Sequence, residues 1–170
     1  MIRLAHTGGD GRGATDPLLA ALAATLAAGG VALAGTVQEN IPRADRRCDM
    51  DLRLLPRGPL LRISADRGAG ARGCRLDAGA LEGAAEWLLR HLDGAALVIV
   101  NKFGRQEAEG RGLAPVIAEA LARGLPVLVG VNALNLGAWL AFSDGLSREL
   151  PPEEGALLSW CRAALVPQAA

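Results

Sequence analysis

The stretch Ala95-Ala-Leu-Val-Ile-Val-Asn-Lys-Phe-Gly-Arg-Gln-Glu-Ala-Glu109 decides the fold class. Residues 96–100 form a short apolar run, which is typical of a strand buried on both faces of a parallel sheet. The run ends in Asn101-Lys102, and Lys102 is the only lysine of the chain. In open α/β sheets, ligands bind at the carboxyl ends of the strands. Asn101 and Lys102 are therefore candidate ligand-binding residues.

Strands and helices are expected to alternate on either side of this stretch. Strands are predicted at 2–5, 31–37, 50–55, 60–64, 96–100 and 126–131. The first helix is expected to be capped by Thr15 or Asp16, to have Pro17 in its first turn, and to end at Gly29-Gly30. Further helices are predicted at about 78–92, 113–123, 136–142 and 153–165.

This alternation predicts an α/β fold of three layers, α/β/α, with a mainly parallel sheet. The two strands at 50–55 and 60–64 are joined by the turn Pro56-Arg-Gly-Pro59, so a β-hairpin is expected as an insertion after the second strand. A single domain is predicted over residues 1–166, with a short tail at 167–170.

Composition excludes several classes of function. The formal net charge of the 170 residues is zero, which gives no electrostatic reason to expect nucleic-acid binding. No apolar run has the length of a membrane span, and the start is too short and too polar for a signal peptide, so a cytoplasmic location is the default expectation. The three cysteines are widely spaced and are expected to be reduced thiols.

A glycine-rich loop, Gly8-Gly-Asp-Gly-Arg-Gly13-Ala14-Thr15, follows the first predicted strand. A phosphate-binding P-loop has the pattern G-x-x-x-x-G-K-[ST] between a strand and a helix, where backbone N–H groups surround the phosphate. The glycines and the hydroxyl are in register here, but Ala14 stands in place of the lysine. Gly8, Gly11, Gly13 and Thr15 are therefore predicted to bind an anion. The alternative is a chance match, because the chain contains 22 glycines.

The pair Asn101-Lys102 stands where P-loop enzymes have an Asp, often followed by Glu, that holds Mg²⁺ and orients water. Replacing Asp-Glu by Asn-Lys changes the local formal charge by about +3 and disfavours a metal cation there. Lys102 is instead expected to supply the positive charge that position 14 lacks. The alternative is that Lys102 only lies along the strand end or pairs with Glu107 or Glu109.

A second loop, Asp66-Arg-Gly-Ala-Gly-Ala-Arg-Gly-Cys-Arg75, could bring several guanidinium groups and free amides to one anion. Arg67, Arg72 and Arg75, together with Arg105, are therefore added to the predicted ligand-binding set. The alternative is a solvated loop whose arginines pair with Asp66 and Asp77.

Three segments, Cys48-Asp-Met-Asp-Leu52, 66–77 and Asn101-Lys-Phe-Gly-Arg-Gln-Glu-Ala-Glu-Gly110, together resemble a bacterial family of uncharacterised domains often encoded beside molybdate-transport genes. The resemblance covers roughly residues 1 to 148. The layout is also similar, more distantly, to small P-loop nucleoside-triphosphatases. The first resemblance implies no reaction, but it makes molybdate or tungstate a reasonable ligand, because both are tetrahedral oxyanions like phosphate and sulfate.

The resulting expectation is a protein that binds an oxyanion or a nucleotide phosphate without hydrolysing it, as a regulator or accessory in molybdenum metabolism with a possible protein partner. No catalytic residue, metal ligand or cofactor is predicted. One alternative is a Mg²⁺-dependent nucleoside triphosphatase with a degenerate P-loop that takes its metal ligands from Asp10, Asp66 or Glu107. Another is a protein-interaction module that docks through its Leu- and Trp-bearing C-terminal helices.

Overall fold

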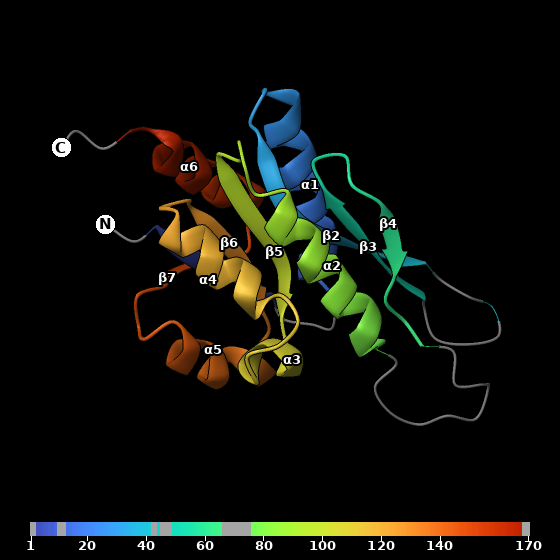
Figure 1. Ribbon diagram of the computed structural model, residues 1–170. Helices are drawn as coiled ribbons and strands as arrows, with labels where there is room; N and C mark the ends of the chain where they lie inside the picture. Colours follow the sequence, from blue (N-terminus) through green and yellow to red (C-terminus); the bar gives the residue numbers. More distant parts are fainter. Residues whose placement is uncertain (1–2, 10–12, 42–43, 45–48, 66–75, 168–170) are drawn as a thin grey trace.

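The computed structural model describes residues 3–9, 13–41, 44, 49–65 and 76–167 (Figure 1). The strands are β1 (Leu4–Thr7), β2 (Leu33–Ile41), β3 (Asp49–Leu55), β4 (Leu60–Arg62), β5 (Leu97–Phe103), β6 (Val127–Val131) and β7 (Arg148–Leu150). The helices are α1 (Thr15–Ala28), α2 (Ala78–Arg90), α3 (Arg105–Ala108), α4 (Ala114–Ala122), η1 (Ala133–Asn135), α5 (Leu136–Phe142) and α6 (Glu154–Leu165).

The seven strands form one mixed sheet in the order β4-β3-β2-β5-β6-β1-β7. Strands β2, β5, β6, β1 and β7 pair with one another in parallel, whereas β2 with β3 and β3 with β4 pair antiparallel at one edge. The predicted mainly parallel sheet with an inserted hairpin is confirmed. Its parallel strands are apolar because both faces are covered, and every residue from Leu97 to Val100 is fully buried.

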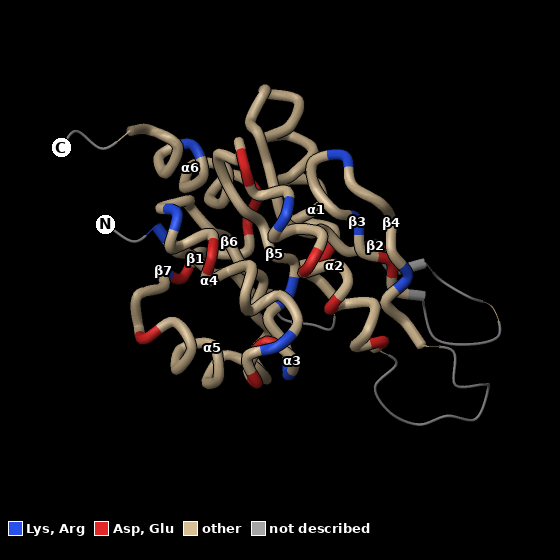
Figure 2. The backbone as a smooth tube through the Cα atoms, in the orientation of Figure 1, with Lys and Arg blue, Asp and Glu red and all other residues tan. Residues whose placement is uncertain are grey.

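Helices cover the two faces of the sheet, as expected for a three-layer domain (Figure 1). On one face, α1 and α6 bury Leu19, Leu22, Leu26, Leu157 and Cys161 against alternate residues of the strands. On the other face, α2, α4 and α5 pack on the remaining strand residues, with Trp139 of α5 fully buried. Positions of Lys and Arg and of Asp and Glu are interspersed along the described backbone (Figure 2).

Four strands, β1, β2, β4 and β5, differ from the prediction by two residues or more at one end at least. β1 is shifted two residues toward the carboxyl end, and β2 and β5 extend past their expected ends at residues 37 and 100. The extra residues of β2, Gln38–Ile41, pair with β3 and not with the parallel sheet, so no apolar pattern marks them. β4 is shorter than expected.

Three short elements, β7, the four-residue helix α3 and the 3-10 helix η1, were not predicted. Each has only three or four residues, so none is long enough to produce a periodic signal. The predicted cap of α1 was wrong: Ala14 occupies the N-cap position without a side-chain bond, and Thr15 and Asp16 are the first two helical residues. Helix α2 is capped by Asp77, because its side chain accepts a hydrogen bond from the backbone N–H of Ala80.

Candidate functional site

The ends of four parallel strands meet at the carboxyl edge of the sheet. Thr7 of β1 pairs with Gly130 of β6, and a Cβ atom added to Gly130 would lie 2.1 Å from the carbonyl oxygen of Asn101 on β5. Thr7 and Asn101 are therefore at the same level of the sheet and two strands apart. Since neighbouring strands are about 4.8 Å apart, the separation is about 10 Å.

The glycine loop begins at this edge. A Cβ atom at Gly8 would lie 2.0 Å from the carbonyl oxygen of Val131, so only glycine fits against the end of β6. Gly13 has a φ of +78°, a conformation that favours glycine, and α1 starts two residues later. The positive end of this 14-residue helix, uncapped by any side chain at Ala14, thus lies beside the loop. Gly11 lies outside the described residues.

A β-bulge places Asn101 and Lys102. Val100 pairs with Val129, but Phe103 pairs with Val131, so β5 has one residue more than β6 over this interval. The extra residue returns Phe103 to the core on the side of Val100, and Lys102 is left exposed. Lys102 makes no ion pair within the part of the chain that the structure describes. The alternative pairing with Glu107 or Glu109 is therefore not formed.

Asn101 lies at the centre of a buried polar network. Its Oδ1 accepts a hydrogen bond from Thr36 Oγ1 over 2.8 Å, and its Nδ2 donates to Gln38 Oε1 over 3.1 Å. The Nε2 of Gln38 in turn donates to a carboxylate oxygen of Asp16, 3.4 Å away. All four side chains are buried. The network joins β5 through β2 to the first turn of α1.

The loop after β5 is held by the buried carboxylate of Glu107. Its Oε2 accepts from the backbone N–H of Gly104 and its Oε1 from that of Leu113, both over 2.9 Å. Both oxygens of Glu107 thus bind backbone within its own loop. Arg105, a predicted ligand-binding residue, is exposed and pairs with Glu109 over 2.9 Å. The hydrogen bond from Arg105 is the main reason that the pKa of Glu109 is lowered.

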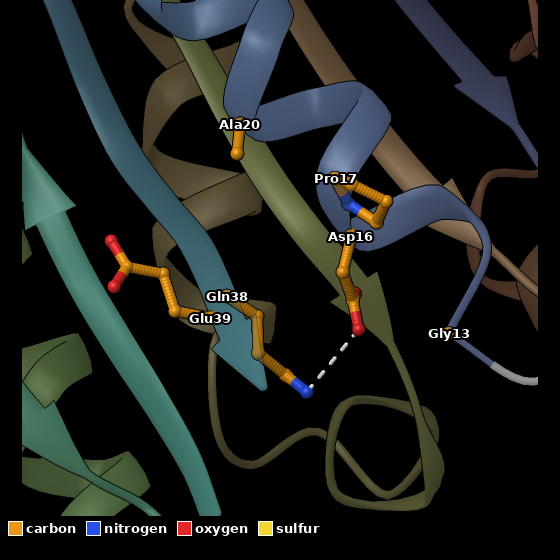
Figure 3. Close-up of a pocket in the computed structure, with 6 residues that line it drawn as sticks. All are labelled: Gly13, Asp16, Pro17, Ala20, Gln38 and Glu39. Atoms are coloured by element: carbon orange, nitrogen blue, oxygen red, sulfur yellow. Dashed lines mark hydrogen bonds between the residues drawn. The ribbon is translucent and has the colours of Figure 1, made fainter. Parts of the chain in front are cut away.

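A pocket of about 550 Å³ opens between the start of α1 and the carboxyl half of β2 (Figure 3). Figure 3 shows the Gln38 side chain reaching toward the Asp16 carboxylate at one side, with Pro17 and Ala20 of α1 along another. The Glu39 carboxylate points away from Asp16, and it pairs with Arg53 over 3.1 Å. The lining residues are Gly13, Asp16, Pro17, Ala20, Gln38 and Glu39.

His6, the residue before the end of β1, is buried near the same edge. Its Nδ1 lies 2.8 Å from Ser147 Oγ, and its ring centroid is 5.9 Å from that of Trp139 on α5. Burial lowers the pKa of His6, and the nearby Glu149 opposes this only in part. Among the described residues, neither His6 Nε2 nor Trp139 Nε1 has a hydrogen-bond partner.

The structure brings Gly8, Gly13, Thr15, Asn101 and Lys102 to one edge of the sheet. Arg67, Arg72 and Arg75 lie outside the described residues, as do Asp10 and Asp66. Sequence reasoning missed Thr36, Gln38 and Asp16 as parts of the site. Two sequence features could have pointed to them. Asp16 directly follows the predicted ligand-binding residue Thr15, and Thr36 is a polar residue in an otherwise apolar predicted strand.

Among the described residues, no three His, Cys, Asp or Glu side chains are grouped so that they could hold a metal ion. Within the same part of the chain, no helix combines the length and apolar character needed to cross a membrane.

Similarity to known proteins agrees with this architecture. The solution structure of a human cancer-related nucleoside triphosphatase matches with a TM-score of 0.55 and 22% identity, over 88% of this chain and 87% of that one. At that identity the match shows the shared fold.

The molybdenum import ATP-binding protein ModC 2 of Bradyrhizobium diazoefficiens is 35% identical over 153 residues, which are 86% of this chain and 17% of that protein. The chain therefore spans less than a fifth of that relative's length. Residues 4–160 match the family described as "Protein of unknown function (DUF2478)", and the chain belongs to this family.

Proposed function

We propose that the protein binds an oxyanion, either free or as the phosphate of a nucleotide, at the carboxyl edge of its sheet and does so without a metal ion. The amides of the glycine loop, the hydroxyl of Thr15 and the ammonium group of Lys102 are the proposed ligands. Arg67, Arg72 and Arg75 are proposed to close over the same anion, and Arg105 to approach it after leaving Glu109.

The observation that supports this proposal most strongly is the pair of side chains at positions 101 and 102, a hydrogen-bonded amide and an exposed ammonium group. Asn101 is a neutral amide whose side chain is already used by Thr36 and Gln38, so it offers no carboxylate to a metal. Lys102 is exposed at the same edge as the loop and forms no ion pair within the described residues. A cationic side chain near the backbone amides at the start of a helix favours an anion directly.

The named relative supports a role in molybdenum handling. ModC 2 is a molybdenum import ATP-binding protein, and the chain matches only part of it. We propose that this chain acts as a regulator or accessory of molybdate import, with molybdate or tungstate among its ligands and the import machinery as a candidate partner. Phosphate and sulfate are the tetrahedral competitors that it must be compared with.

A thermal-shift panel tests the proposal. Molybdate, tungstate, sulfate, phosphate, ATP and GTP are each added with EDTA or with Mg²⁺, because a ligand that binds the folded state raises the apparent melting temperature. At least one oxyanion or nucleotide is expected to raise the Tm in EDTA. A panel in which every rise requires Mg²⁺, or in which nothing raises the Tm, contradicts the proposal.

A Mg²⁺-dependent nucleoside triphosphatase is the second candidate, and Asp16 is the observation that favours it. This buried carboxylate follows Thr15 directly and lines the pocket beside the loop. A phosphate-release assay separates the two candidates, because metal-dependent turnover that is abolished by Thr15→Ala requires an enzyme. Glu107, by contrast, uses both oxygens within its own loop.

A further inference from the structure

We propose that the outer face of α5 binds a second copy of this chain, so that two copies pack their α5 helices against each other around a two-fold axis. This α5 face consists of the exposed residues of η1, of α5 and of the turn after it, between Ala133 and Leu146. The interface lies outside the glycine loop, and it does not depend on the anion proposed to bind there.

The α5 face gathers most of the large apolar side chains that the described residues expose. Four of the six lie within it, with Leu134 91%, Leu146 54%, Leu140 45% and Phe142 36% exposed. The other two, Leu60 on β4 and Val166 after α6, are single residues, and scattered exposed apolar residues are ordinary. Several such residues on consecutive elements, in contrast, mark an interaction surface.

The composition of α5 indicates that both of its sides are covered. Its sequence, Leu136-Gly-Ala-Trp-Leu-Ala-Phe142, contains no polar side chain, and a helix that is apolar all round is normally buried all round. On the inner side, the ring of Trp139 packs against those of Phe103 and His6, with centroids 5.1 and 5.9 Å away. The residues that α5 leaves exposed are Gly137, Ala138, Leu140, Ala141 and Phe142.

Charge excludes two other kinds of partner. Between Arg123 and Asp144 the sequence has no charged residue, and Figure 2 shows α5 without a charged position. A nucleic acid requires cationic side chains for its phosphates. A helix that lies on a membrane carries Lys or Arg along a polar side, which α5 lacks. The fitting partner is therefore an uncharged protein surface, and a second α5 face has this property.

The charges at the two ends of α5 favour an antiparallel pair. Figure 1 shows α3 at one end of α5, with which it is in contact, and the chain leaving the other end toward β7. In and after α3, the exposed Arg105 and Arg111 share the single carboxylate of Glu109, so one positive charge is in excess.

After the other end of α5, one negative charge is in excess among the exposed residues Asp144, Arg148 and Glu149. A two-fold axis across α5 sets each end of the helix against the opposite end of the second helix. Unlike charges therefore meet at both ends of the pair, while the uncharged middle meets its own copy. This self-complementarity is the reason that a second copy is the proposed partner.

The size of the α5 face indicates weak association. Interfaces of stable complexes contain about 20–30 residues on each side, and the segment from Ala133 to Leu146 is shorter than that. We therefore expect a dimer that forms at micromolar concentration and dissociates on dilution.

Sedimentation equilibrium of the full chain, at about 1 μM to about 200 μM, measures this association. The parent should approach twice the mass of one chain at the upper end. Leu140→Glu brings two carboxylates into the interface and should weaken the dimer at least tenfold. Leu60→Glu is the matched control, because Leu60 is 44% exposed, against 45% for Leu140, and lies on β4 outside the face. It should dimerise as the parent does.

Two further variants test the site and its orientation. Ala141→Glu places a good helix former at an exposed position of α5, so the fold is kept and the dimer should again weaken at least tenfold. Asp144→Asn removes the negative charge, and asparagine adopts the φ of +50° found there. It should weaken the dimer several-fold at low salt and less at high salt.

A parent that stays monomeric over the whole range contradicts the proposal. A monomeric parent that sediments with anionic phospholipid vesicles would assign the face to a membrane and would also overturn it. A dimer that Leu140→Glu and Ala141→Glu disturb no more than Leu60→Glu does would place the interface elsewhere. Unchanged association of Asp144→Asn at low salt would contradict the antiparallel arrangement.

Discussion

The side-chain amide of Asn101 on β5 donates a hydrogen bond to Oε1 of Gln38 on β2 over 3.1 Å, while its oxygen accepts from Thr36. An asparagine can donate and accept at once, whereas an ionised aspartate can only accept. The amide is therefore required by its neighbours. With aspartate at this position, Gln38 would have to turn its donor toward β5 and its oxygen toward the carboxylate of Asp16.

Asn101→Asp should accordingly destabilise the protein at neutral pH by about 1–3 kcal/mol, the cost of an unmatched buried polar group. Urea unfolding at pH 7 measures this loss. At pH 4 the difference from the parent should shrink, because a protonated carboxyl group can donate to Gln38 again. Equal stability of the two proteins at pH 7 would show that the network does not require a donor at position 101.

Two neighbouring glycines of the loop, Gly8 and Gly9, should differ in how well they tolerate substitution by alanine. Gly8→Ala would place its Cβ 2.0 Å from the carbonyl oxygen of Val131, so backbone has to move, and a loss of about 1–3 kcal/mol is expected. Gly9→Ala is the control, because its nearest neighbour is the Cβ of Ala14 at 3.4 Å. Thermal unfolding of both variants is compared with the parent. A Gly8→Ala protein that is as stable as Gly9→Ala would contradict the close contact between the loop and β6.

Glu107→Gln tests whether the loop after β5 depends on a buried carboxylate. One of the two oxygens that accept from Gly104 and Leu113 becomes an NH₂ group facing a backbone N–H, so a loss of about 1–3 kcal/mol is expected. Glu109→Gln is the control, since Glu109 lies at the surface and pairs with two exposed arginines, Arg105 and Arg111. Denaturant unfolding should separate the two variants clearly. Similar unfolding midpoints for the two variants would show that the loop does not depend on the carboxylate of Glu107.

The stability of the protein should fall in mild acid because of His6. Burial lowers its pKa in the folded state, while in the unfolded chain the pKa is close to its ordinary value of about 6.5. The unfolded chain therefore binds the proton more readily. The stability that neutral His6 contributes is fully present above about pH 6.5, and it is lost as the pH falls toward the lowered pKa of His6 in the folded state.

Unfolding curves from pH 7.5 to pH 5 measure this dependence in the parent, in His6→Gln and in His91→Gln. The slope should be reduced in His6→Gln. It should persist in His91→Gln, which removes the other histidine of the chain. An unchanged slope in His6→Gln would assign the pH dependence to other groups.

The order of strands and helices could be predicted from the sequence because it depends on local signals. The apolar run at Leu97–Val100, the turn between β3 and β4, and Gly29-Gly30 after α1 each mark an element within a few residues. The ion pair of Arg105 with Glu109 also follows a local rule, since residues four apart on a helix are neighbours. That rule could have warned against Arg105 as a free ligand.

The polar network could not be predicted, because it depends on register between distant strands. Thr36 and Asn101 are 65 residues apart, and they meet only because β2 pairs with β5 and a bulge turns Asn101 toward Thr36. Gln38 lies in a segment with loop-like composition that becomes strand only by pairing with β3. A single extra residue in β5 leaves no trace in the hydrophobic pattern.

The central claim is that an exposed lysine at a strand end replaces a metal ion in anion binding. Calorimetric titration of the parent, Lys102→Ala and Lys102→Arg with ATP, pyrophosphate and molybdate in EDTA tests it most directly. The parent should bind at least one of these ligands without metal. Lys102→Ala should bind that ligand about tenfold more weakly or worse, since charged hydrogen bonds contribute about 1.5–3 kcal/mol, and Lys102→Arg should stay within a few-fold of the parent. Binding that appears only when Mg²⁺ is added, or equal affinity in Lys102→Ala and the parent, would contradict the claim.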